Sequence, residues 1–148
     1  MSDWLWGRAE IDGITVLASS VRFNESQGEV EDPLLYVVKG DQIYLNAIKD
    51  EIACLEGVKI PHPDTNKKIS GDCIYIVENE KGRASIRFNG QRQIIASFPF
   101  TNSSDDWETW YARFLSDTTL DIDMNGVQLN IHGHSTLENM DFFGRKKK

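Results

Sequence analysis

A chain of 148 residues with 40% hydrophobic and 26% charged residues has the size and composition of one globular domain, which excludes a disordered chain. The net charge of −7 argues against nucleic-acid binding, since the only basic cluster is residues 145–148, which reads as a solvated tail. Two cysteines are too few for a disulfide scaffold, no secretory signal follows Met1, and no apolar run approaches the roughly 20 residues that span a bilayer, so we expect a cytoplasmic protein with reduced thiols.

The first segment predicts a β-hairpin. Residues 4–11 and 14–23 both read as strands, and Asp12-Gly13 between them is typical of a type I′ turn, which needs positive φ at both central residues. Alternation divides the first strand into two faces, Trp4, Trp6, Arg8 and Glu10 on one and Leu5, Gly7, Ala9 and Ile11 on the other. Neither face is purely polar, which suits a barrel strand with an inside and an outside.

The next stretch adds a second pair of strands. A polar loop at 24–32 leads into strands at 33–38 and 42–47, which a tight turn joins. The segment 48–55 fits either one helical turn or an irregular strand. Glycine and prolines at 56–66 predict an extended loop.

The second half of the chain reads as a continuing meander. Two alternatives stay open at 107–115: a short helix capped by Asp105 or Asp106, or a strand through Tyr111–Leu115. Asn125-Gly126 gives a second hairpin signal. We expect strands at 68–78, 83–89, 92–98, 120–124, 127–132 and 135–143.

Many short strands with turns at short spacing predict an all-β fold. Almost every connection is short, so an up-and-down antiparallel barrel is favoured. We expect a single antiparallel β-barrel domain over residues 1–148, with at most short helices.

Two motifs resemble a known family. The run Trp4-x-Trp6-Gly7-Arg8 resembles the strand that opens the second of two barrels in the lipocalin-like superfamily of carotenoid 1,2-hydratases, kievitone hydratase and fungal decalin-forming Diels–Alderases. The stretch 133–142 is similar to the closing strand of that barrel. The resemblance therefore covers one lipocalin-like barrel. The family's first barrel and its His-Asp-x-Asn stretch have no counterpart in these residues, so a reaction that needs both barrels would not be complete here.

The resemblance implies an enzyme of natural-product metabolism. It would act as a hydratase, cyclase or isomerase on an apolar terpenoid, polyene or polyketide, without a cofactor, by holding a reactive conformer in a dry cavity. Two alternatives remain: a non-catalytic carrier of an apolar ligand, and a structural barrel filled by its own side chains. The family pairs two barrels in one chain, so we also expect a homodimer, formed through a face such as that of Leu5, Ala9 and Ile11.

Aromatic residues on the strands are the candidate ligand-binding groups. Trp4, Trp6 and Arg8 would form a pocket wall with a cation, or Arg8 would stack on an indole at the closed end of the barrel. Tyr36 and Tyr44, like Tyr75 further along the chain, would either meet a ligand or fill the barrel. The alternatives are not separated by the residues alone.

Polar residues near the second hairpin are the candidate catalytic groups. Asp121 and His132 fall on one face of the hairpin, and Glu138 follows on the last strand. An inward face would suit proton transfer, whereas an outward face would only be solvated. His132 and His134 share a strand face, but a metal site would need Asp121 or Glu138 as a third ligand, and we expect none.

Overall fold

The computed structural model describes residues 3–23, 31–63, 68–90, 94–100 and 109–141. Within these ranges the only helix is a single 3-10 turn, and no helix is long and apolar enough to cross a membrane. The strands are β1 Asp3–Ile11, β2 Ile14–Arg22, β3 Glu31–Lys39, β4 Gln42–Ile48, β5 Ile52–Glu56, β6 Lys59–Pro61, β7 Lys68–Ser70, β8 Asp72–Asn79, β9 Gly82–Asn89, β10 Ile94–Phe100, β11 Thr109–Met124 and β12 Val127–Asp141.

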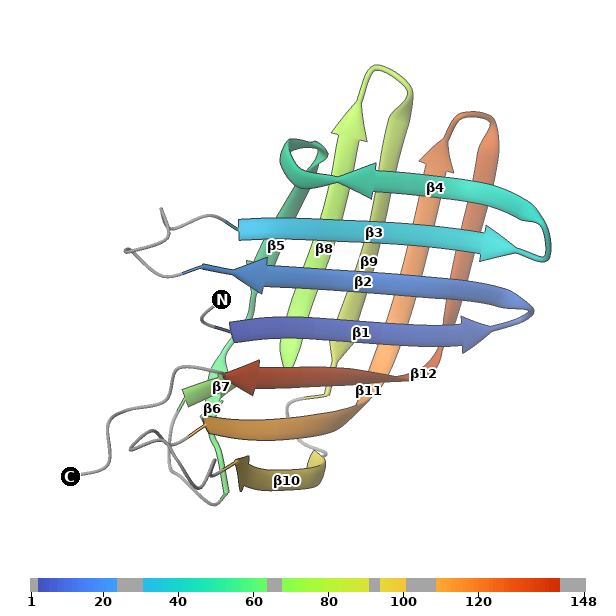
Figure 1. The fold of residues 1–148 in the computed structure, drawn as a ribbon. Helices are drawn as coiled ribbons and strands as arrows, with labels where there is room; N and C mark the ends of the chain where they lie inside the picture. The colour runs from blue at the N-terminus through green and yellow to red at the C-terminus, as the bar shows by residue number, and fades with distance from the viewer. Residues whose placement is uncertain (1–2, 24–30, 64–67, 91–93, 101–108, 142–148) are drawn as a thin grey trace.

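Ten of the strands form one antiparallel sheet that folds back on itself as a nearly closed barrel (Figure 1). The strand order is β4-β3-β2-β1-β12-β11-β9-β8-β5, with β10 added on β11, while β6 and β7 form a separate ribbon. The all-β barrel expected from the sequence is thereby confirmed.

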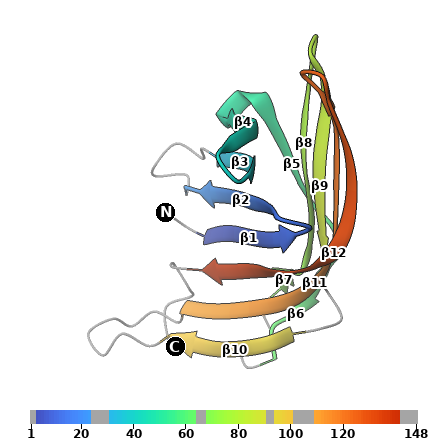
Figure 2. The same cartoon turned by 90° about the vertical axis from the view of Figure 1, so that its right-hand side faces the viewer.

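Two long strands turn the sheet from one layer into the other. The C-terminal part of β12 pairs with β1, whereas the C-terminal part of β11 pairs with β9 (Figure 2). Strands β1 to β4 consequently run across β8 and β9 in the facing layer. The two ends of the strand order, β4 and β5, bound a seam where the barrel is not closed by a strand ladder.

Both hairpin turns predicted from the sequence are present. Asp12 and Gly13 have φ of 53° and 74°, and Asn125 and Gly126 have φ of 54° and 76°. Positive φ at both central residues matches the right-handed twist of the flanking strands, which sets the register Ile11↔Ile14 in the first hairpin.

The ambiguous segments resolve in different ways. Residues 49–51 form the 3-10 turn and residues 52–56 form β5, so both alternatives for 48–55 hold in part. The expected strand at 68–78 is broken into β7 and β8 at Gly71. Strand β11 is continuous from Thr109, which favours the strand alternative there, and residues 105–108 lie outside the described ranges.

The face that enters the core is the one carrying Leu5, Ala9 and Ile11, at 1%, 1% and 8% exposure. A homodimer through this face is therefore wrong, because the face is already buried within the chain. The homodimer itself stays a prediction.

Phe88 of β9 fills the centre of the barrel against β1. A Cβ added at Gly7 would lie 2.7 Å from Cε2 of Phe88, so the missing side chain leaves room for the ring. Tyr75 of β8 packs edge-on to the same ring at 6.4 Å between centroids. The two layers thus meet directly at this level, and side chains fill the centre of the barrel.

Candidate functional site

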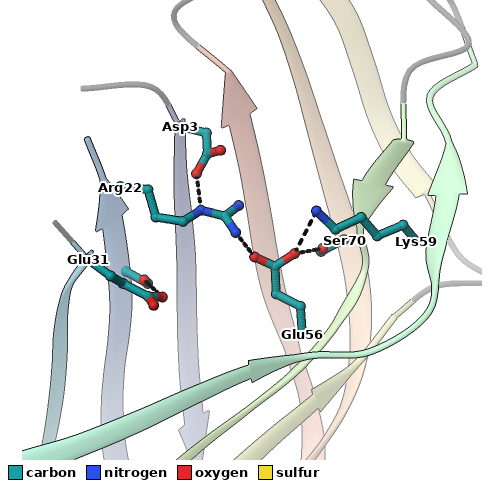
Figure 3. A network of polar contacts seen from close by, with 7 residues as sticks. Asp3, Arg22, Glu31, Glu56, Lys59 and Ser70 are labelled. Atoms are coloured by element: carbon teal, nitrogen blue, oxygen red, sulfur yellow. Dashed lines mark hydrogen bonds and ion pairs between the residues drawn. The ribbon is translucent and has the colours of Figure 1, made fainter. Parts of the chain in front are cut away.

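A chain of charged contacts lies inside one end of the barrel (Figure 3). Alternation on β2 places Arg22 on the same inward face as the buried Val16 and Ala18. The Arg22 guanidinium donates to Asp3 of β1 and to Glu56 of β5, and both carboxylates form ion pairs with it. Arg22 thereby joins the two layers close to the seam.

Glu56 is the centre of this polar cluster, which comprises Asp3, Arg22, Glu56, Lys59 and Ser70. Besides Arg22, it accepts a hydrogen bond from the Ser70 hydroxyl and lies 3.3 Å from the Lys59 ammonium. Burial alone would raise the pKa of Glu56, but the Ser70 hydrogen bond and the charges of Arg22 and Lys59 outweigh it and leave the pKa lowered. Glu56 is therefore an ionised anchor at neutral pH rather than a proton donor.

Hydroxyl and thiol groups continue the polar lining inward from this cluster. Ser20 donates to Glu31 at 2.5 Å, and the Cys54 thiol interacts with both Ser20 and Tyr75. Burial raises the pKa of Cys54 to about 12, with the charge of Glu31 adding to the shift. Cys54 is consequently a protonated, unreactive thiol at neutral pH. Tyr75, the residue opposite Cys54 on β8, is fully buried.

A pocket of about 240 Å³, here called the rim pocket, opens between β4 and the tips of the facing hairpins. Its apolar part comprises Tyr44, Leu45, Ala47, Val77 and Met124. Glu51, Lys81 and several asparagines surround it with polar groups. An apolar floor with a polar edge is typical of a small-molecule site, although this volume is below the usual 300–1,000 Å³.

The predicted ligand-binding residues mostly lie outside the barrel. Trp4 and Trp6 share a face as expected, 6.2 Å apart between ring centroids, but it is the outward face of β1. Arg8 on the same face is exposed, so it does not close the barrel from within. Tyr36 is half-buried on the outward face of β3. Of these residues, Tyr44 alone lines the rim pocket.

The predicted catalytic residues are not brought together. Asp121 and His132 share a face, but both are exposed, which is the outward alternative. Asn130 donates to Asp121 across the hairpin. Glu138 lies six residues, or about 20 Å, along β12 from His132. Its carboxylate forms an ion pair with Arg113 at 2.6 Å. An inward acid–base pair is therefore not formed by these three side chains.

An outer groove of about 610 Å³ surrounds Asp121. It also contains Arg83, Asp123 and Asn130, all exposed on the outside of the sheet. The imidazole of His134 lies 3.2 Å from the carboxylate of Asp117. Among the described residues, no group of three His, Cys, Asp or Glu side chains lies together to hold a metal ion.

Sequence reasoning missed the polar cluster. Its signal is visible in β2, where Arg22 ends an inward face that otherwise carries Ile14, Val16, Ala18 and Ser20. A cation on an apolar face implies a buried partner. The partner, Glu56, is 34 residues away, and no local pattern identifies it.

Comparison with known proteins supports the fold. No family model and no curated protein matches the chain. The crystal structure of CghA with Sch210972 is similar over 96% of this chain, with a TM-score of 0.64 and 13% sequence identity. This chain covers 41% of that chain, so it spans less than half of its length. The similarity shows a related barrel, in agreement with the two sequence motifs.

Proposed function

We propose that this barrel binds an apolar small molecule of the terpenoid, polyene or polyketide type, with the apolar body of the ligand in the rim pocket. The observation that carries the proposal is the apolar floor of Leu45, Ala47, Val77 and Met124 inside a polar edge. Burial of ligand surface on these side chains supplies the affinity. The related fold of CghA, whose crystal structure is a complex with Sch210972, adds support.

The proposed activity is that of a hydratase, cyclase or isomerase. A rigid apolar pocket favours a reactive conformer by restricting a flexible chain, so confinement alone accelerates a unimolecular reaction. The resemblance of Trp4-x-Trp6-Gly7-Arg8 to the hydratase and Diels–Alderase superfamily motivates this class of activity. A carrier would use the same pocket and return its ligand unchanged.

A filled structural barrel is the second candidate. The direct contact of Phe88 with the backbone at Gly7 favours it, because the centre of the barrel holds side chains rather than a ligand. The two candidates differ in what the rim pocket does, and ligand binding separates them.

The test is a titration of the protein with farnesal, in which the change in intrinsic tryptophan fluorescence reports binding. We expect Ala47→Leu, which fills the rim pocket, to weaken farnesal binding by about tenfold or more. Ala53→Leu on the exposed face of β5 is the matched control and should bind normally. Equal affinity of both variants, or no binding by the native chain, contradicts the proposal. Mass spectrometry of the recovered ligand then distinguishes turnover from carriage.

A further inference from the structure

The layer formed by β1 to β4 and the end of β12 has an apolar outward face. In an antiparallel sheet the face turned away from the core is commonly polar. Here it carries Trp6 at 38% and Ile48 at 49% exposure, with half-buried apolar side chains between them. We call this surface the outward patch, and its main members are Trp4, Trp6, Leu17, Leu34, Tyr36 and Ile48.

The outward face of the opposite layer is different. Its exposed side chains on β9, on the second half of β11 and at the start of β12 are charged or carry amides: Arg83, Arg87, Asp121, Asp123, Gln128 and Asn130. Large apolar side chains are thus concentrated outside one layer of the barrel. A contiguous apolar surface of this kind marks an interaction site.

The strand register arranges the outward patch in rows that complement each other. Trp6 and Leu34 lie in one row, connected through β2, and Arg8 and Tyr36 lie in the next row. A twofold axis that runs across the strands between these two rows brings Arg8 of one copy over the Trp6 ring of another. The same axis brings Leu34 onto Tyr36. The patch is therefore complementary to a second copy of itself.

Charge supports this pairing. Arg8 is exposed in the middle of the patch, and it forms no ion pair with any residue that the structure describes. A guanidinium stacks favourably on an indole ring, so each copy offers a cation to the aromatic ring of the other. Tryptophan, tyrosine and arginine are also the residues most enriched at the centres of protein interfaces.

The area of the patch is sufficient for a dimer. Strands β1, β2 and β3 have nine residues each. Five neighbouring strands of this length form a surface of about 24 by 30 Å, or about 700 Å². The side chains make the accessible area larger than this flat outline. A specific interface of ordinary size buries about 800 Å² per partner, which the outward patch can supply.

We propose that two copies of this chain associate face to face through their outward patches, related by a twofold axis between the rows of Trp6 and Arg8. The buried face of Leu5, Ala9 and Ile11 is not available for a dimer, whereas the other face of the same strand is. Sheets pack in this way with their strands aligned to within about 30°. The dimer does not depend on a ligand in the rim pocket, so it goes beyond the proposed function.

The test is sedimentation velocity over a dilution series, in which the native chain should be a dimer at micromolar concentrations. Trp6→Arg should weaken the dimer by about 30-fold or more, since it removes a central aromatic side chain and places two like charges together. Trp6→Glu should weaken it at least about fivefold less, because the new carboxylate faces Arg8 of the other copy.

Arg8→Glu and Arg83→Glu form the matched control pair, with the same charge change on the two outward faces. Arg8→Glu should weaken the dimer about tenfold, and Arg83→Glu should leave it unchanged. Circular dichroism checks that each variant keeps its strands; should either Trp6 variant fail to fold, the arginine pair decides alone. A native chain that stays monomeric overturns the proposal. Equal effects within the arginine pair, or within the Trp6 pair, overturn it as well.

Discussion

At the scale of single residues, Glu56 holds together groups that come from separate parts of the chain. Its carboxylate meets the Arg22 guanidinium, the Ser70 hydroxyl and the Lys59 ammonium. Its side chain is 14% exposed, so these contacts compensate for a large loss of hydration. Removing one member of such a cluster costs more than the contact contributes, because the partner is left with an uncompensated charge.

Glu56→Gln should therefore lower the free energy of unfolding at pH 7 by about 2 kcal/mol, as measured by urea denaturation. Glu138→Gln is the control. The ion pair of Glu138 with Arg113 is more exposed, and its loss should cost less than about 1 kcal/mol. Similar values for the two variants would contradict a stabilising role for the polar cluster.

The same pair of proteins should show a defined pH dependence. The folded-state pKa of Glu56 lies below its ordinary value of 4.5, so ionised Glu56 stabilises the fold above about that pH. This contribution is lost as the pH falls through the folded-state pKa. The stability difference between the native chain and Glu56→Gln should shrink below pH 4.5, and a difference that grows there would contradict the assigned pKa shift.

At the scale of elements, β1 and β9 are fitted to each other through a glycine. Gly7 is the only position of the inward face of β1 without a side chain, and Phe88 occupies the space. The bulky ring is thus accommodated without moving the strand, and both residues lie in the packed centre of the barrel. The glycine of the Trp4-x-Trp6-Gly7-Arg8 motif is therefore explained by core packing, because a side chain there would overlap the Phe88 ring.

Gly7→Ala should destabilise the fold by about 2 kcal/mol through overpacking. Phe88→Leu in the same chain should recover part of that loss, because a smaller side chain makes room for the new methyl group. A double-mutant cycle from urea denaturation measures this coupling, which we expect to be about 1 kcal/mol. Strictly additive effects would mean that the two positions do not meet.

At the scale of the whole molecule, the barrel has a continuous wall and a seam. Strand β1 is paired on both sides, with β2 and with β12. Strands β4 and β5 each end the strand order, and the rim pocket opens beside β4. The cluster around Glu56 crosses from β1 and β2 to β5, which stabilises the barrel near its incomplete side.

Amide hydrogen exchange should reflect this asymmetry. Amides of β4 and β5 that face the seam should exchange at least about 100-fold faster than those of β1, because no neighbouring strand protects them. Glu56→Gln should speed exchange in β5 more than in β12. Uniform protection over all strands would show that the seam is closed in solution.

Local sequence determined the strands, the two hairpin turns and the alternation of faces. Strand periodicity and the positive φ of Asp12-Gly13 and Asn125-Gly126 depend on neighbouring residues only, which is why they were predictable. Tyr36 and Tyr75 were both considered as inward residues; Tyr75 is buried in the core, whereas Tyr36 lies on the outward face of β3.

Only the tertiary structure decided which face is inside and where the site lies. Both faces of β1 carry apolar residues, so alternation did not distinguish the buried Leu5 from the exposed Trp6. The large tryptophan side chains favoured their own face as the pocket wall, but that face is the outward one. The contact of Arg22 with Glu56 joins residues 34 positions apart. Such contacts arise from the folding of the sheet onto itself, and no periodicity along the chain encodes which distant partner a buried charge meets.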